Sequence, residues 1–360
     1  MKTASILMIF TLVVSAACAE APSVAPAPEQ NSEALGALPE QSELEAALEA
    51  FDVPGMAMAT LTACEVDGVA VAGVADLDTG APVSADTAFE AASLSKAVFA
   101  YLVMTLVEDG LVDLDRPLAE EFDYPRISDK AAYAQITPRM ILAHRTGLPN
   151  WVDEATEFQE RSATIPFEFV PDTAYGYSGE GIQLLQAYIE FKTGTPLQQL
   201  FEERLGTVMP QSRFEQPLPS GLSPSRGYEA TSQPETGRDM DNLKQVGMAA
   251  GSLVTRAGDF ADFLSHVCLQ RGLSEESYAE MFRPQSPVPE GESMLPTSWG
   301  LGWMTVDLGG ARFVGHAGNN DEYRALAGII LETGDGFAIF TNGSNGEALI
   351  NALTAPPEPE

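Results

Sequence analysis

Ser93-Leu94-Ser95-Lys96 stands at the start of a long apolar pattern over residues 98–106, which predicts a buried helix closed by Gly110. Residues three apart lie side by side on a helix, so we expect the Ser93 hydroxyl and the Lys96 amine to meet. A serine hydroxyl becomes a good nucleophile when a neighbouring base takes its proton, and a desolvated lysine can be that base. The spacing therefore predicts an acyl-transfer site, although chance alone can supply so short a pattern.

Short apolar runs at both ends of the chain predict the strands of one sheet. Near the N-terminus, residues 56–61 and 69–74 flank Asp67-Gly68, which predicts a hairpin turn. Further strands are predicted at 299–306, 311–314, 323–331 and 336–341, and helices at 42–51, 181–192, 253–266 and 347–353. We therefore expect an α+β domain, with an antiparallel sheet of N- and C-terminal strands, helices packed on it and a mostly helical middle lobe.

The composition limits partners and cofactors. Asp and Glu number 52 against 19 Lys and Arg, and the net charge of −33 argues against nucleic acid and anionic membrane surfaces. A hydrophobic content of 45% is that of a soluble globular protein. Three scattered histidines predict no metal site, and the chain has no phosphate-cradling loop, so we expect no cofactor. Oligomeric state is not indicated.

The first 41 residues predict export. Lys2 precedes a short apolar run and a group of small residues, as in a secretory signal peptide spanning residues 1–18. Either Ala17-Cys18-Ala19 is an ordinary cleavage site, or Cys18 is the lipidated residue of a lipoprotein that is tethered to a membrane. Residues 19–41, rich in Pro, Ala, Glu and Ser, predict a disordered tether before a folded domain at 42–355. We expect a periplasmic, membrane-anchored or secreted protein.

Two further cysteines, Cys64 and Cys268, leave two alternatives open. An oxidising compartment permits a disulfide between them. Two buried free thiols fit the sequence equally well, because proximity cannot be derived from it.

Two other segments carry candidate site residues. Tyr175-Gly176-Tyr177-Ser178-Gly179 opens the second helix on a glycine-rich turn, and Gly315-His316-Ala317-Gly318-Asn319 follows a predicted strand. Glycine at such positions lets the backbone approach a ligand closely. Taken singly, Tyr177 fits a packing residue and His316 a structural histidine. His144, in a glycine- and proline-containing loop, is interpreted as structural.

Together these residues resemble the serine hydrolase family of class C β-lactamases, D-alanyl-D-alanine carboxypeptidases, D-aminopeptidases and related esterases. The resemblance covers about residues 51–353 and keeps the family's order of motifs. Besides the Ser93 and Tyr177 motifs and residues 109–115 and 144–149, it rests on Asp86-Thr87-Ala88-Phe89, Gly251-Ser252-Leu253-Val254-Thr255, Gly300-Leu301-Gly302-Trp303 and His316-Ala317-Gly318.

The resemblance implies a role for each site residue. Ser93 would be the acylated nucleophile, and either Lys96 or Tyr177 would take its proton. The backbone N–H groups of Ser93 and Asn319 would form the oxyanion hole, and His316 would stand in the third motif, as in many esterases of the family. Gly179, Ala317 and Gly318 would line the substrate pocket.

Two departures from the family pattern bear on the substrate. Gly179 stands where the second motif usually has asparagine, which in β-lactamases helps hold the substrate amide and the lysine. His316-Ala317 replaces the Lys-Thr pair that binds the substrate carboxylate. We therefore expect an exported serine hydrolase acting on carboxylic esters or small amides and peptides. The alternatives are a D,D-peptidase or β-lactamase, and a non-catalytic binding module on the same scaffold.

Overall fold

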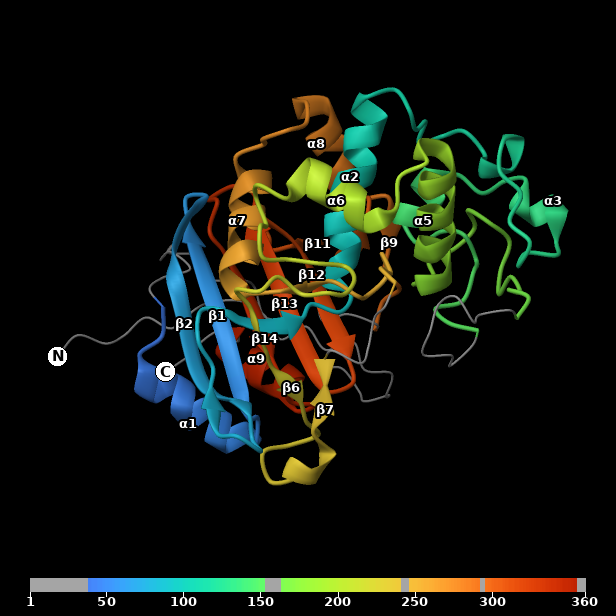
Figure 1. The fold of residues 1–360 in the computed structure, drawn as a ribbon. Helices are drawn as coiled ribbons and strands as arrows, with labels where there is room; N and C mark the ends of the chain where they lie inside the picture. Colours follow the sequence, from blue (N-terminus) through green and yellow to red (C-terminus); the bar gives the residue numbers. More distant parts are fainter. Residues whose placement is uncertain (1–37, 153–162, 241–245, 292–294, 355–360) are drawn as a thin grey trace.

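The computed structural model describes residues 38–152, 163–240, 246–291 and 295–354 (Figure 1). Cys18, the predicted signal peptide and most of the predicted tether lie outside these residues. Within the described residues, no helix has both the length and the apolar character needed to cross a bilayer.

A nine-stranded antiparallel sheet forms the centre of the fold, in the order β3-β2-β1-β14-β13-β12-β11-β10-β9. The two ends of the chain meet where β1 pairs with β14, with Met56 opposite Thr341 and Leu61 opposite Gly336. This confirms the predicted α+β class. The strands are β1 (Gly55–Thr62), β2 (Glu65–Asp76), β3 (Ala81–Pro82), β9 (Ser286–Pro287), β10 (Thr297–Trp299), β11 (Met304–Asp307), β12 (Arg312–Asn320), β13 (Tyr323–Ile330) and β14 (Gly336–Thr341).

Helices cover both faces of this sheet (Figure 1). On one face, α1 (Gln41–Phe51) and α9 (Gly346–Thr354) pack on a cluster that includes Met56 and Met58. On the other, α2 (Leu94–Glu108) and α7 (Ala257–Cys268) pack with Ala57 and Ala59. Because β1 is buried on both faces, its sequence is a continuous apolar run, with small side chains turned toward the larger helices.

Of the remaining helices, α6 and α8 lie beside α2, and α3 and α5 lie on the side away from β1 and β2 (Figure 1). The remaining helices are α3 (Lys130–Tyr133), α4 (Pro138–Leu142), α5 (Gly179–Thr193), α6 (Leu197–Leu205) and α8 (Glu275–Phe282), with 3₁₀ turns at Leu118–Glu120 and Pro234–Thr236. Short strands complete the fold: β4 (Thr87–Glu90), β5 (Ser223–Pro224), β6 (Arg226–Gly227), β7 (Arg238–Asp239) and β8 (Val254–Thr255).

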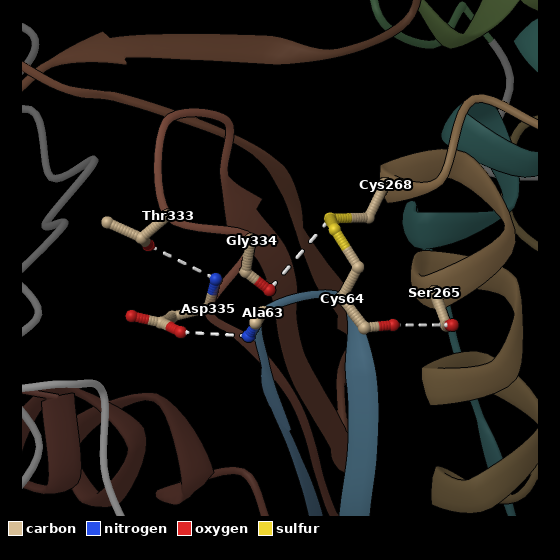
Figure 2. The surroundings of a disulfide bond; sticks show 7 residues. All are labelled: Ala63, Cys64, Ser265, Cys268, Thr333, Gly334 and Asp335. Carbon is tan, nitrogen blue, oxygen red and sulfur yellow. Dashed lines mark hydrogen bonds between the residues drawn. A yellow bond between two sulfur atoms is a disulfide. The ribbon is translucent and has the colours of Figure 1, made fainter.

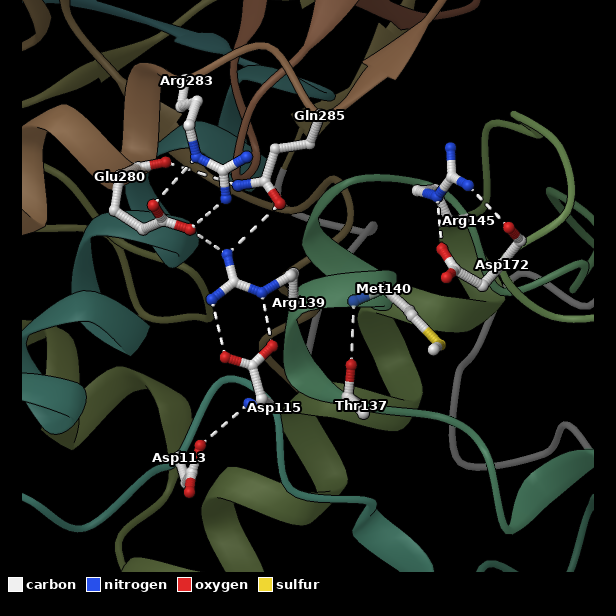
Figure 3. Close-up of polar contacts among 10 residues, drawn as sticks. All are labelled: Asp113, Asp115, Thr137, Arg139, Met140, Arg145, Asp172, Glu280, Arg283 and Gln285. Atoms are coloured by element: carbon white, nitrogen blue, oxygen red, sulfur yellow. Dashed lines mark hydrogen bonds and ion pairs between the residues drawn. The ribbon is translucent and has the colours of Figure 1, made fainter.

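Arg139 on α4 joins three of these segments (Figure 3). Its guanidinium donates two hydrogen bonds to the Asp115 carboxylate, at 2.6 and 2.8 Å. It also pairs with Glu280 of α8 and donates to the Gln285 side chain at 3.3 Å. The connection after α2, the short helix α4 and helix α8 are therefore tied together.

Several predicted boundaries were wrong. The β1–β2 turn is Ala63-Cys64, with φ of 50° and 70°, and Asp67-Gly68 lies inside β2. The strand pairing shifts its register between Thr60 and Leu61, so Gly68 pairs with Thr60 inside the ladder and is not part of the turn. The sequence pattern does not reveal this irregularity. The helix predicted at 253–266 begins only at Ala257, because residues 254–255 form β8 and pair with β4.

The third error concerns residues 299–306, which form a hairpin rather than one strand. Gly302 takes φ of 74° between β10 and β11, and a Cβ there would lie 2.3 Å from the Ala100 Cβ on α2. Close packing against the helix therefore requires glycine and breaks the strand. Strand β12 is longer than predicted and includes His316 through Asn320. Helix α5 begins two residues earlier than predicted, since the Ser178 hydroxyl accepts a hydrogen bond from Gly181 N–H at 2.8 Å.

A disulfide joins Cys64, in the β1–β2 turn, to Cys268 at the end of α7 (Figure 2). The two Cα atoms lie 5.5 Å apart across 204 residues of sequence. The Ser265 hydroxyl donates to the Cys64 carbonyl at 2.6 Å, which ties the same turn to the same helix. Of the two alternatives left open by the sequence, the structure has the bridge.

Candidate active site

Ser93 lies at the N-terminus of α2, directly after a constrained turn. Ala92 is buried with φ of 48°, a left-handed conformation that a non-glycine residue adopts only when its surroundings hold it there. The Ala91 N–H donates to the Leu253 carbonyl at 2.8 Å, and the Ser95 hydroxyl donates to the Ala92 carbonyl at 2.5 Å. The turn is therefore fixed from both sides, and it presents Ser93 at the positive end of a core helix.

Lys96 is only 1% exposed, and its amine lies 2.9 Å from the Ser93 hydroxyl oxygen. This confirms the contact expected from the three-residue spacing. The amine also donates to the Ala250 carbonyl at 2.5 Å. Burial lowers the pKa of Lys96 to about 7, so a large fraction of the amine is neutral at neutral pH. A neutral amine 2.9 Å from a serine hydroxyl can accept its proton.

Tyr177 precedes the N-cap of α5, and the Lys96 amine lies 4.9 Å from the centre of its ring. Burial raises the pKa of the Tyr177 phenol, and its hydrogen bond with Ser93 acts in the opposite direction. The phenol is therefore protonated at neutral pH. In that state it can donate a proton but cannot accept one from Ser93.

Strand β12 brings His316 and Gly318 to the same place. A Cβ on Gly318 would lie 2.5 Å from the Ala91 carbonyl, so only glycine lets this strand approach the turn before Ser93. Within the described residues β11 pairs with β12 only as far as Gly315, which leaves Asn319 on a stretch with a strand neighbour on one side. Ala317 is exposed on the same stretch.

His316 is buried and neutral. Its Nδ1 lies 2.6 Å from the Ala317 carbonyl, which can only accept, so Nδ1 carries the proton. Burial and then the nearby Lys96 lower the pKa of His316 to about 3. His316 packs edge-on to Trp299, at 5.0 Å between ring centres, and its ring centre lies 6.2 Å from that of Tyr177. His316 therefore carries no positive charge at neutral pH.

Gly179, at the start of α5, packs against Trp151. A Cβ on Gly179 would lie 2.5 Å from two atoms of the indole ring, so the ring fills the volume in which a side chain at 179 would begin. Asn150 holds the two segments together: its side chain accepts from Gly179 N–H at 2.9 Å and its carbonyl from Glu180 N–H at 3.0 Å. Trp151 is 39% exposed.

Several groups that help to position Lys96 could not be predicted from the sequence. The Ala250 carbonyl reaches Lys96 because Gln183 on α5 accepts from Ala250 N–H at 2.9 Å, and Gln186 accepts from Ala249 N–H at 2.8 Å. Both glutamines are buried. The sequence signal for this arrangement is the pair of glutamines three residues apart on an otherwise apolar helix, because buried amides need hydrogen-bond partners.

The structure thus brings Ser93, Lys96, Tyr177 and His316 together, and sets Gly318 against the turn before Ser93. Gly179 lies against Trp151, Asn319 is exposed on β12, and Cys18 lies outside the described residues. A serine paired with a buried lysine one helical turn away, beside an antiparallel sheet, defines a serine hydrolase. The chain matches the model of the Beta-lactamase family over residues 42–354 and belongs to that family.

Named relatives span several activities. The chain is 25% identical over 311 residues to Penicillin-binding protein 4 of Amycolatopsis lactamdurans, covering 81% of each chain. It is 26% identical over 294 residues to Esterase EstB of Burkholderia gladioli, covering 66% of this chain and 71% of the esterase. The fold matches that of D-amino acid amidase from Ochrobactrum anthropi SV3 with a TM-score of 0.71 at 23% identity, covering 87% of this chain and 96% of the amidase. The family is therefore clear, whereas the relatives differ in substrate.

Proposed function

We propose that this protein is an exported hydrolase that forms an acyl-enzyme on Ser93, preferentially with neutral carboxylic esters or small amides. The observation that carries the proposal is the Lys96 amine, 99% buried, lying 2.9 Å from the Ser93 oxygen with a pKa of about 7. A structural lysine on a surface helix would be exposed and charged. Burial of this one costs stability, and a buried lysine with a lowered pKa beside a serine hydroxyl is a candidate functional group.

The proton steps follow from the two pKa directions. Lys96 takes the proton of Ser93 as the serine oxygen attacks the substrate carbonyl, because its amine is partly neutral whereas the Tyr177 phenol is protonated. The oxyanion would be held by the backbone N–H groups of Ser93 and Asn319. Tyr177 then donates its proton to the leaving group and regains one from Lys96. Water releases the acyl group by the reverse sequence.

The substrate class follows from the charge and shape of the site. A neutral His316 cannot pair with a carboxylate as a lysine would. The Trp151 ring fills the space beside Gly179 and offers an apolar edge to the acyl group. Both features favour uncharged, apolar acyl donors over β-lactams, which carry a carboxylate.

A second candidate is a D,D-peptidase. One observation favours it: the stretch of β12 from His316 to Asn320 has a strand neighbour on one side only, within the described residues, and an extended peptide could pair there. The relative named penicillin-binding protein is consistent with this candidate. Failure to bind a fluorescent penicillin would count against it.

Export is proposed from the N-terminal sequence, and the Cys64–Cys268 disulfide supports an oxidising compartment. Lipidation is tested with Cys18→Ser: palmitate labelling that is lost in the variant supports a lipoprotein, and labelling that persists excludes Cys18 as the site.

The substrate class is tested on one purified sample with 4-nitrophenyl esters of increasing acyl length, D-amino-acid amides and a chromogenic cephalosporin. We expect ester turnover, slower amide turnover and little cephalosporin hydrolysis. Cephalosporin turnover that exceeds ester turnover would contradict the proposed substrate preference.

A further inference from the structure

His144 is completely buried at the end of α4, next to the site but on a different segment from the proposed catalytic groups. Its backbone is left-handed, with φ of 54°, a conformation that is uncommon for residues other than glycine and that histidine, asparagine and aspartate adopt more often than the rest. The sequence alone predicts a structural loop residue. In the structure, the contacts of His144 are concentrated on one short segment.

This segment is the one that carries Tyr177. The His144 carbonyl accepts from Gly176 N–H at 2.9 Å, and its Nδ1 accepts from Ser178 N–H at 3.2 Å. Between these two bonds, the imidazole packs on the Tyr177 ring, with ring centres 4.4 Å apart and planes inclined by 37°. His144 therefore contacts three consecutive residues with Tyr177 in the middle. Trp299 packs edge-on to the imidazole, with 4.7 Å between the ring centres.

Burying the His144 imidazole costs folding free energy. Since Nδ1 accepts a hydrogen bond, the proton of the neutral ring is on Nε2, and Nε2 is buried with no hydrogen-bond partner among the described residues. A buried unsatisfied donor costs about 1–3 kcal/mol. Burial and the charge of Lys96 also hold the pKa of His144 far below its usual value, which keeps Nδ1 free to accept. A leucine would fill the same space without an unpaired N–H, so filling space is not what the imidazole contributes.

We propose that His144 is a positioning residue for Tyr177: by holding Gly176 and Ser178 and packing on the ring between them, it fixes the phenol hydroxyl at Ser93. This inference rests on the proposed function, because it assigns His144 to the tyrosine that donates the proton to the leaving group. It requires no contact between His144 and the substrate, so substrate affinity should change little when His144 is replaced.

Three substitutions separate positioning from packing. In His144→Asn the amide oxygen lies close to where Nδ1 was, and asparagine tolerates the left-handed backbone. In His144→Gln the oxygen lies nearer the place of Nε2, and in His144→Leu there is no acceptor. We expect kcat for an ester to fall by about 10- to 100-fold in the leucine variant with KM nearly unchanged, and by about threefold in the asparagine variant.

A double-mutant cycle with Tyr177→Phe supplies the readout that a merely structural role would not change. If His144 acts through the Tyr177 hydroxyl, His144→Leu should lower kcat by less than about twofold in the Tyr177→Phe background. Multiplicative losses in the cycle would overturn the inference, as would an asparagine variant no better than the glutamine variant. If the leucine variant does not fold, the asparagine–glutamine comparison still decides.

Failure of the proposed function is recognised separately. Wild-type protein that is not labelled on Ser93 by a fluorophosphonate would reject the acyl-enzyme itself. Labelling of the wild type together with a multiplicative cycle would reject only the role of His144.

Discussion

At the scale of single residues, the proposed chemistry depends on a lysine that the fold has made a weaker base. Lys96 is surrounded by protein, its amine is shared between the Ser93 hydroxyl and the Ala250 carbonyl, and it lies in the first turn of α2, where the helix dipole opposes a positive charge. The lowered pKa makes the charge state of Lys96 dependent on pH near neutrality.

We predict that kcat/KM for a neutral ester rises with pH along a limb with an apparent pKa of about 7, because only the neutral amine can accept the Ser93 proton. Lys96→Met should lower kcat/KM by about 10²-fold or more. An ester whose hydrolysis does not change between pH 5.5 and 8.5 would contradict this assignment.

The same burial that prepares Lys96 for catalysis should lower the stability of the folded protein. The unfolded chain holds the proton up to about pH 10.5 and the folded protein releases it near pH 7, so the unfolded state binds more protons between these values. Stability therefore rises with pH through this window, and the burial of Lys96 is most costly below pH 7. Lys96→Met should melt at a higher temperature than wild type at pH 6, with a difference that narrows toward pH 10.

Gly179 and Trp151 form a second pair of residues, in which the indole ring fills the space that a side chain at 179 would need. We predict that Gly179→Ala costs about 1–3 kcal/mol of unfolding free energy, because the new Cβ would overlap the indole ring. In a Trp151→Ala background the same change should cost much less, since the ring is gone. Urea unfolding of the four proteins measures the coupling, and equal costs in both backgrounds would show that the ring does not fill this space.

Trp151→Ala on its own should also reduce the preference of kcat/KM for long over short acyl esters. Phe191→Ala is the matched control, because Phe191 is exposed on the far end of α5.

At the scale of elements, the start of α5 depends on a buried ion pair. Glu180 is fully buried and accepts two hydrogen bonds from Arg126, at 2.7 and 3.2 Å, while Val152 N–H donates to the same carboxylate at 3.3 Å. The pair thus links α5 to the loop before α3 and to the residue after Trp151.

We predict that Arg126→Ala destabilises the protein by about 3–5 kcal/mol, because it leaves the Glu180 carboxylate buried without this guanidinium. The matched control is Arg116→Ala, which removes an exposed pair with Glu120 and should cost less than about 1 kcal/mol. Thermal or urea unfolding provides the comparison. Similar losses in the two variants would contradict the account of α5.

Element patterns in the sequence predicted the fold better than the site. The apolar residues of α2, β1 and β14 have clear periodicities or continuous runs, and each was placed within a few residues. The predicted boundaries of helices and strands were wrong where tertiary contacts override the local sequence pattern. Examples are Gly302, which packs against α2, and Val254, which pairs with Glu90 in a short strand. The contact between Ser93 and Lys96 followed from helix geometry alone.

The rest of the site is assembled from distant segments, and spacing cannot predict it. Tyr177 and His316 needed the family resemblance, because neither residue is distinctive by itself. The Ala250 carbonyl, Trp151 and the role of His144 are visible only in the folded chain, since each acts through backbone groups or shape rather than through a recognisable motif.

At the scale of the whole molecule, the Cys64–Cys268 disulfide closes a loop of 204 residues that contains most of the site. We predict that reduction, or the Cys64→Ser/Cys268→Ser double variant, lowers stability by about 2–4 kcal/mol. Ester turnover at 25 °C should change little, because the bridge contacts the β13–β14 turn and α7, which carry none of the site residues. Parallel melting and activity measurements test both parts, and lost turnover in a folded double variant would contradict the second.

The central claim is tested most directly by intact-protein and peptide mass spectrometry after brief exposure to an activated ester or a fluorophosphonate. The account predicts one covalent adduct, located on Ser93, that forms slowly in Lys96→Met and does not form in Ser93→Ala. An adduct on another residue, or equal labelling of the wild type and the Ser93→Ala variant, would contradict it.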